Sequence, residues 1–421
     1  MSSHIEKAYE IARDRYAHLG IKTDAVLKKI QEKSISLHCW QGDDVRGFER
    51  SDAALTGGGI QTTGHYPGRA RNADELRMDL EKAFSLIPGT HRVNLHAIYG
   101  EFGTKGVERN TIEPRYFNAW IDWAKTRGLG LDFNATLFSH PKADAGFTLS
   151  SKDSEIRKFW IDHVKCCRRI AAYMGKALNR PCIHNLWIPD GMKDSCVDRG
   201  GYRAILKDSL NEIFEIAYDP LELKDSLESK LFGIGSESYV VGSHEFYLGY
   251  ALTHNMMLCL DLGHFHPTES VADKISSIMQ FFQEMLLHIS RGVRWDSDHV
   301  AIFDDQMRDI AQEIVRNDAL ERVHIALDFF DASINRIGAW VTGARATLKA
   351  LLSALLEPTD MLVRSEEKHN YFARLALLEE IKTMPLGAVW DFYCLTNNIP
   401  VGDDWISVVL QYEKDVLSKR L

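Results

Sequence analysis

The chain alternates short apolar runs, which are typical of buried strands, with longer amphipathic stretches, which are typical of helices. Eight apolar runs recur at intervals of a few dozen residues, at 34–40, 92–99, 129–138, 181–188, 231–237, 257–261, 286–289 and 323–328. Strands that alternate with helices pair in parallel through right-handed crossovers. Eight such units predict an α/β fold of the (β/α)8, or TIM barrel, type, with an active site at the carboxyl ends of its strands. An open doubly wound sheet is the alternative, but no G-x-G-x-x-G motif follows the first run.

Amphipathic stretches lie between these runs and continue after the last one. They cover 5–30, 73–86, 113–127, 154–178, 202–218, 245–255, 268–287 and 304–317. After residue 335 the chain has helical runs separated by Pro358, Pro385 and Pro400, with no further strand pattern. We therefore expect a barrel catalytic domain with an N-terminal helix over residues 1–335 and a C-terminal helical extension over 336–421. The apolar faces of the extension need cover, so we expect it to pack on the barrel or on a neighbouring subunit.

The composition argues against several classes of partner. The 421 residues are 45% hydrophobic and 26% charged, enough to bury a large core, and the formal net charge is −9. An acidic balance with no block of lysine or arginine argues against nucleic acid and against an anionic membrane surface. No window approaches the roughly 18 to 20 apolar residues of a membrane span, and the start of the chain lacks a signal-peptide pattern. Seven cysteines, an odd number with no C-x-x-C pair, predict reduced thiols and a cytoplasmic protein.

Ligand-type side chains gather at the carboxyl ends of the later runs. The sixth run ends in Asp261, and Gly263 then permits a sharp turn before His264. Asp296 and Asp298 follow the seventh run, and their i, i+2 spacing on an extended chain aims both carboxylates at one point. Two carboxylates held that close repel each other unless a cation lies between them. His264, Asp296 and Asp298 therefore predict a metal site.

A second group of ligands is expected beside the first. It combines the ends of the fifth to eighth runs through Glu237, Asp261, His288 and Asp328. Asp331 competes with Asp328 on the last run, and we prefer Asp328 because it directly ends the apolar segment. A dinuclear site with a shared carboxylate follows. Oxygen and imidazole ligands suit Mn²⁺, Mg²⁺ or Co²⁺ better than an ion that prefers thiolates.

Each of these features has a more ordinary explanation when it stands alone. A single D-x-D is often a solvated turn, and a histidine such as His288 on an apolar strand is more often a hydrogen-bonded core residue than a ligand. Ligand types at the ends of several neighbouring strands are a rarer coincidence, and together they favour a metal centre.

The earlier runs end in residues suited to a polyhydroxylated ligand. Aromatic rings and hydrogen-bonding groups occur at Trp40, His96, Phe138 and Trp187, which we predict to bind substrate. Barrel packing is the alternative role for Trp40 and Trp187. A glycine-dense segment, 55–68, follows the first run and lacks the Lys-Ser/Thr of a phosphate-binding loop, so we interpret it as a mobile lid.

Four long stretches carry a resemblance to a known family. They read LFGIGSES at 231–238, LDLGHFHPTE at 260–269, VRWDSDHV at 293–300 and LDFFDASINR at 327–336. With these stretches, essentially the whole chain resembles the L-rhamnose isomerases, which are bacterial aldose–ketose isomerases. The resemblance implies a barrel with a helical extension, a homotetramer, and Mn²⁺ dependence with two divalent ions per subunit and Zn²⁺, Co²⁺ or Mg²⁺ as substitutes. It also implies interconversion of L-rhamnose and L-rhamnulose, the first step of L-rhamnose catabolism.

The resemblance also implies a role for individual residues. A substrate-side ion would be held by His264, Asp296 and Asp298. A structural ion would be held by Glu237, Asp261, His288 and Asp328. More distant sugar isomerases have a lysine two residues after the glutamate of the fifth strand, and that position is Tyr239 here, so no lysine role is expected there.

The ligand set favours one reaction, with two alternatives. A divalent cation that touches both O1 and O2 of an aldose would support a metal-mediated 1,2-hydride shift. Asp296, Asp298 and Asp328 are the expected catalytic residues, because the oxygen-bound proton must also move. The alternatives are a metal-dependent barrel hydrolase and a non-catalytic barrel whose ions only stabilise the fold. Because histidine ligands must be neutral, metal affinity and activity are expected to fall below about pH 6.

Overall fold

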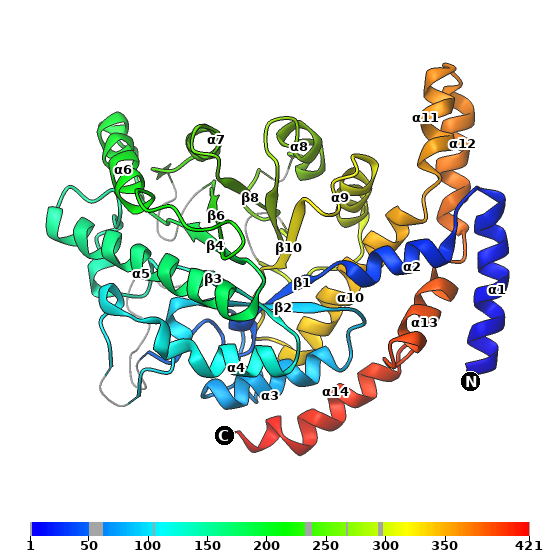
Figure 1. Ribbon diagram of the computed structural model, residues 1–421, viewed down its shortest axis with the longest axis horizontal. Coiled ribbons are helices and arrows are strands. Elements are labelled where there is room, and N and C mark those ends of the chain that lie inside the picture. The colour runs from blue at the N-terminus through cyan, green and yellow to red at the C-terminus, as the bar shows by residue number, and fades with distance from the viewer. Residues whose placement is uncertain are drawn as a thin grey trace.

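The computed structural model describes residues 2–49, 62–103, 106–231, 238–266, 268–293 and 298–420. Within them, eight parallel strands close a barrel in the order β1-β10-β9-β8-β6-β4-β3-β2. Figure 1 shows barrel strands with helices around them. The strands are β1 Ile35–His38, β2 His91–His96, β3 Gly130–Asn134, β4 Cys182–Trp187, β6 Leu223–Glu228, β8 Met257–Asp261, β9 Met285–Ile289 and β10 Val323–Leu327. A separate antiparallel pair joins β5 Gly191–Met192 to β7 Tyr239–Val240. The closed parallel barrel confirms the predicted fold class.

The barrel strands are buried on both faces. Every residue of β1, β3, β8 and β9 is buried, which is why these strands appear in the sequence as continuous runs rather than as alternating patterns. One set of side chains forms a small separate core cluster of Ile183, Met257, Cys259, Leu286 and Ala326. The other set belongs to the main hydrophobic core with the surrounding helices.

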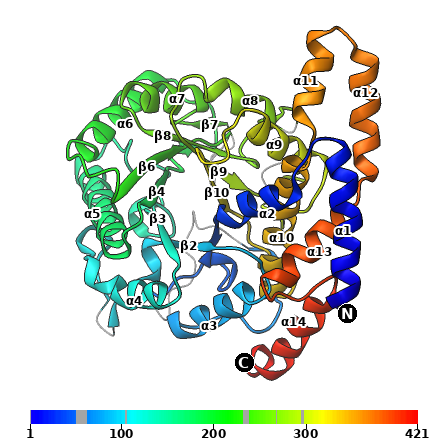
Figure 2. The same ribbon diagram turned by 45° about the vertical axis from the view of Figure 1, so that its right-hand side comes forward.

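Helices surround the strands (Figure 2). They are α3 Ala73–Phe84, α4 Asn118–Thr126, α5 Ser154–Leu178, α6 Arg199–Ile213, α7 His244–Thr253, α8 Val271–Ile278, α9 Asp305–Arg316 and α10 Arg336–Leu355. The helix α5 coincides with the predicted stretch 154–178. Asp153 caps its first turn by accepting hydrogen bonds from the backbone N–H groups of Glu155 and Ile156, and Asn179 ends it in a left-handed conformation.

The prediction of the fifth barrel strand at 231–237 is wrong. The fifth strand is β6, Leu223–Glu228, which lies between β4 and β8. Its sequence, LKDSLE, has only two apolar residues, so a search for apolar runs passes over it. The polar side chains of β6 are instead satisfied by partners, since Lys224 pairs with Glu284, and Asp225 pairs with Arg168 and His184.

The chain ends in helices that lie to one side of the barrel. These are α11 Thr359–Glu367, α12 Tyr371–Glu380, α13 Leu386–Thr396 and α14 Asp404–Asp415, and they lie near the N-terminal helices α1 Ser2–His18 and α2 Thr23–Glu32 (Figure 2). The helix α10 packs against α9, α3 and α2, and α13 packs against α1. The α11–α12 pair projects away from the barrel. The domain boundary at 335/336 stays a prediction. None of the described helices has the length and apolarity needed to cross a bilayer.

Candidate metal centre

Four ligand-type side chains meet at the carboxyl ends of four strands that are neighbours in the barrel. Glu228 ends β6, Asp261 ends β8, His288 lies near the end of β9, and Asp328 directly follows β10. The strand order places β6, β8, β9 and β10 side by side, and the register pairs Asp261 with His288. One ligand atom from each of the four side chains lies within 4.8 Å of the others. This arrangement is the geometric basis of a metal centre.

His288 lies among the three carboxylates. Its Nδ1 atom is 3.2 Å from Asp328 Oδ2, 3.4 Å from Glu228 Oε2 and 3.7 Å from Asp261 Oδ2. His264 borders the group, with its Nδ1 atom 2.9 Å from Glu228 Oε1. The side chains of Glu228, Asp261 and His288 are almost fully buried, and Asp328 retains partial exposure. The cluster therefore lies inside the barrel mouth with one accessible side.

Neighbouring groups hold the carboxylates in place. The backbone N–H of Gly263 donates to Asp261 Oδ1 at 2.7 Å, and the Ser290 hydroxyl donates to the same atom at 3.2 Å. The Trp40 indole N–H donates to Asp328 Oδ1 at 3.0 Å. In both residues one carboxylate oxygen is fixed by the protein, while Oδ2 faces His288. Metal ligands in proteins are commonly oriented by such hydrogen bonds.

Glu228 is held by an amide. The Asn185 side chain, on β4, donates a hydrogen bond to Glu228 Oε2. The strands β4 and β6 pair in register, with Trp187 opposite Glu228, so Asn185 lies two positions before the partner of the glutamate, on the same side of β4. The fixed geometry of Glu228 therefore comes from the adjacent strand.

The electrostatics of the cluster show where protons reside without a cation. Burial opposes ionisation of Glu228, but the charge of His288 and the hydrogen bond with His264 hold the pKa of Glu228 well below its usual range. Burial likewise opposes the charged form of His288, yet the acidic neighbours Cys259, Glu228 and Asp328 raise the pKa of His288 well above its usual value. Burial, followed by the charges of nearby carboxylates, raises the pKa of Asp261 to about 7. Protons on His288 and Asp261 thus offset the buried negative charge.

The residues present fit a divalent cation. Asp261 Oδ2 and both ring nitrogens of His288 are buried and have no hydrogen-bond partner among the described residues. Buried polar atoms without partners are costly, and a cation would satisfy Asp261 Oδ2 together with one of the two His288 nitrogens. Carboxylate oxygens with an imidazole nitrogen suit Mn²⁺, Mg²⁺ or Co²⁺. Cys259 forms a second close group with Glu228 and His288, so a thiol also borders the centre.

The structure brings together part of the predicted ligand set. Asp261, His288 and Asp328 lie in the cluster, and His264 borders it. Asp331 is not among the four ligand-type residues, and its Oδ1 atom accepts hydrogen bonds from Ser333. Asp298 lies next to the loop after β10, since its backbone carbonyl accepts a hydrogen bond from Phe330 N–H at 3.2 Å. Asp296 and Glu237 lie outside the described residues, as do residues 55–61 of the predicted lid.

Glu228 is the ligand-type residue that the sequence analysis missed. It ends the fifth strand, where Glu237 was expected, and it was overlooked because LKDSLE does not resemble a buried strand. The spacing of the strands offered the available signal, since 223–228 lies midway between β4 and β8. With Glu228 ending the strand, the residue two positions later is Lys230 rather than Tyr239. Lys230 Nζ lies 4.9 Å from the centre of the Trp187 ring, so a lysine does stand beside the site.

The four predicted substrate-binding residues form one continuous row of rings. The ring centroids of Trp40 and His96 are 4.8 Å apart, those of His96 and Phe138 are 5.5 Å apart, and those of Phe138 and Trp187 are 5.8 Å apart, all in edge-on contact. We call this set the aromatic row. It begins at Trp40, which bonds Asp328, and follows the ends of β1 to β4. Burial lowers the pKa of His96 to about 4, so this ring is neutral.

Together, the fold and the cluster define a (β/α)8-barrel protein with a buried carboxylate–imidazole cluster that could hold a metal ion. The family model for L-rhamnose isomerase (RhaA) matches residues 3–420. The chain is 57% identical over 419 residues to an L-rhamnose isomerase of Rhodopirellula baltica, covering 100% of this chain and 98% of that protein. It is 58% identical over 416 residues to one of Bacteroides thetaiotaomicron, covering 99% of each. The chain belongs to the L-rhamnose isomerase family and is therefore an aldose–ketose isomerase.

A solved structure of an L-ribulose 3-epimerase is also similar. It has a TM-score of 0.47 at 11% sequence identity and covers 79% of this chain and 97% of that chain.

Proposed function

We propose that the chain converts L-rhamnose to L-rhamnulose with a divalent cation, Mn²⁺, held by Glu228, Asp261, His288 and Asp328. The observation that carries this proposal is the convergence of four ligand atoms within 4.8 Å, two of which, from Asp261 and His288, have no hydrogen-bond partner in the described structure. A bound ion supplies Lewis-acid polarisation of the sugar oxygens at C1 and C2, which favours transfer of the C2 hydrogen directly to C1.

The residues around the centre would bind and orient the open-chain sugar. The aromatic row offers apolar faces to its C–H groups and excludes water from one side of the site. The Trp187 indole N–H is buried without a partner among the described residues, so a sugar hydroxyl is a suitable acceptor. Lys230 lies against the same ring, and we propose that its ammonium group binds a sugar oxygen.

Two further parts of the proposal concern the proton and a second ion. Asp298 and Asp328, with Asp296, are our candidates for moving the proton between O2 and O1. We also propose a second, substrate-side ion at His264, Asp296 and Asp298. The proposal is supported by the position of His264, whose Nδ1 atom is 2.9 Å from Glu228 Oε1 of the first group. An ion bound by His264 would therefore lie next to the first ion, as in other dinuclear sites.

We further propose a homotetramer in the cytoplasm. Tyr371, Phe372 and Leu375 on α12 are 54%, 81% and 65% exposed, an apolar face that a second copy of the chain would cover. All seven cysteines are free and buried, which fits a reducing compartment. The change Phe372→Glu should lower the mass measured by light scattering, and an unchanged tetramer would exclude α12 from the interface.

The reaction is tested with L-rhamnose deuterated at C2. Direct transfer keeps most of the label on C1 of the ketose in ordinary water, whereas an enediol route loses it to solvent. Mass spectrometry of the product distinguishes the two outcomes. The same assay after chelation should show no turnover, and activity restored by Mn²⁺ would support the centre. Turnover that survives chelation would contradict it.

A further inference from the structure

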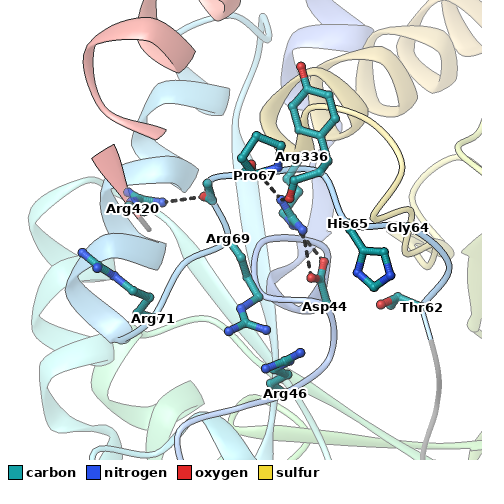
Figure 3. Close-up of a pocket in the computed structure, with 12 residues that line it drawn as sticks. Asp44, Arg46, Thr62, Gly64, His65, Pro67, Arg69, Arg71, Arg336 and Arg420 are labelled. Atoms are coloured by element: carbon teal, nitrogen blue, oxygen red, sulfur yellow. Dashed lines mark hydrogen bonds and ion pairs between the residues drawn. The ribbon is translucent and has the colours of Figure 1, made fainter. Parts of the chain in front are cut away.

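A cavity of about 410 Å³ outside the metal centre is lined by five arginines. It lies where the chain leaves η1 Cys39–Gln41, after β1, and where α10 begins, after β10. We call it the arginine pocket, and its charged residues are Asp44, Arg46, Arg69, Arg71, Arg336 and Arg420 (Figure 3). So dense a positive cluster stands out on a chain whose net charge is −9.

Three of these arginines already have carboxylate partners. Arg336 donates to both oxygens of Asp44 at 2.8 Å and to the carbonyl of Tyr66. Arg420 is paired with Asp79, and Arg71 with Glu75. These three arginines therefore stabilise the wall of the pocket, and their charge is largely neutralised by the paired carboxylates.

Arg46 and Arg69 differ from the other three. Within the described part of the chain, neither guanidinium makes a hydrogen bond or an ion pair. Figure 3 shows the two side chains next to each other, beside the Asp44–Arg336 pair. Burial, followed by repulsion from Arg46, lowers the pKa of Arg69, which confirms that the two charges act on one another. Asp43 and Asp44 act favourably on Arg69, but Asp44 is already bonded to Arg336.

The backbone holds Arg46 in this position. Asp44 and Val45, directly before it, have φ values of 60° and 59°, a left-handed conformation that is unfavourable for a β-branched residue. The turn is fixed by the Asp44–Arg336 pair and by the hydrogen bond from Val45 N–H to the Trp40 carbonyl at 3.1 Å. Two like charges are therefore kept together by the fold, and within the described residues no carboxylate forms an ion pair with either of them.

We propose that the arginine pocket binds the phosphate group of a small phosphorylated metabolite. Adjacent guanidinium groups match the geometry of phosphate oxygens and bind them through paired, charge-assisted hydrogen bonds. The cavity volume falls in the range of roughly 300 to 1,000 Å³ typical of small-molecule sites, which leaves room for the organic part of a phosphate monoester. A neutral sugar does not require two adjacent guanidinium groups that lack a bonded carboxylate, so we take this site to be distinct from the substrate site.

The test is isothermal titration of the full-length, Mn²⁺-loaded protein at constant ionic strength, with inorganic phosphate and with glycerol 3-phosphate as probes. We expect one saturable site per chain. The double variant Arg46→Gln/Arg69→Gln should bind about tenfold more weakly or worse. The control Arg13→Gln/Arg115→Gln removes the same charge from exposed positions elsewhere and should bind normally. If the double variant does not fold, Arg46→Glu alone, at an exposed position, replaces it.

A second control separates this site from the metal centre. Glu228→Gln weakens the proposed metal site and should leave phosphate binding intact, so the result does not depend on the proposed reaction. Tighter binding of glycerol 3-phosphate than of phosphate identifies an ester ligand, and equal binding identifies the phosphate group alone. The proposal is overturned by the absence of saturable binding, by binding that survives Arg46→Gln/Arg69→Gln, or by binding lost only in Glu228→Gln.

Discussion

Strand β6 carries two carboxylates three residues apart, with Glu228 buried and Asp225 largely buried, and they have opposite surroundings. Asp225 receives hydrogen bonds from Arg168 at 2.9 to 3.2 Å and lies 2.9 Å from His184. Glu228 has two imidazoles, those of His264 and His288, and the amide of Asn185 as its partners among the described residues. Burial opposes ionisation of Asp225, but His184 and Arg168 outweigh it and lower the pKa of Asp225. Because its partner Arg168 is always charged, Asp225 has a structural role. The positive charge beside Glu228 comes from imidazoles, which can lose their protons and give way to a metal ion.

The largest effect should come from exchanging the two acids for their amides. Glu228→Gln keeps the shape but removes a ligand charge, so kcat/KM for L-rhamnose should fall about a thousandfold or more. Asp225→Asn leaves a buried arginine unpaired and should lower the free energy of unfolding by about 3 to 5 kcal/mol, while the folded protein keeps its Mn²⁺ response. Steady-state kinetics measures the change in kcat/KM, and urea denaturation measures the change in the free energy of unfolding. Loss of the Mn²⁺ response in Asp225→Asn alone would reverse our assignment.

The next effect is on pH. Because the pKa of His288 is raised well above its usual value and that of Asp261 to about 7, both must release protons before they bind a cation. Protons and metal therefore compete, and Mn²⁺ affinity should rise about tenfold or more per pH unit from about pH 6 to 7. Calorimetry in buffers of different ionisation enthalpy would count one to two protons released. A binding heat independent of the buffer would refute this.

A smaller effect is expected at Trp40. Trp40→Phe keeps an aromatic ring in the row but removes the N–H that donates to Asp328. Mn²⁺ affinity should fall about tenfold, as is usual when a group that orients a ligand is lost. Phe138→Leu, which changes the row without touching a ligand, is the control and should leave the affinity unchanged. Equal effects from the two variants would show that the hydrogen bond is unimportant.

The smallest effect should come from the amino-terminal part of the same strand. Lys224 pairs with Glu284, which also bonds His324, and the pair is partly exposed. Lys224→Met should lower the free energy of unfolding by about 1 kcal/mol or less. Hydrogen bonding to His324 and Lys224 lowers the pKa of Glu284 from 4.5 to about 2, so its contribution is present above pH 4.5 and is lost as the pH falls toward 2. Denaturation curves at pH 7 and pH 3 would check both.

The sequence alone predicted the elements whose physics is local. The helix α5 has a capping aspartate and a long amphipathic stripe, and β8 is an unbroken apolar run, so both were located to the residue. The expectation that ligand-type side chains at the carboxyl ends of parallel strands meet also placed Asp261, His288 and Asp328 together correctly. These predictions succeeded because each depends on a pattern within a few consecutive residues.

The features that were missed depend on partners far away in the chain. The strand β6 tolerates Lys224 and Asp225 because Glu284 and Arg168 neutralise them, and no pattern within LKDSLE reveals that. Glu228 was lost with it. The arginine pocket is similar, since Arg46 and Arg336 are nearly 300 residues apart in sequence and meet through the closure of β1 against β10.

The hydrogen bond between Trp40 and Asp328 has a practical consequence. An indole bonded directly to a carboxylate of the centre makes the intrinsic fluorescence of the protein sensitive to what occupies that centre. A paramagnetic ion such as Mn²⁺ would quench the emission of this ring more strongly than that of distant tryptophans. The difference spectrum between the protein and Trp40→Phe would then report site filling in real time, without any added dye.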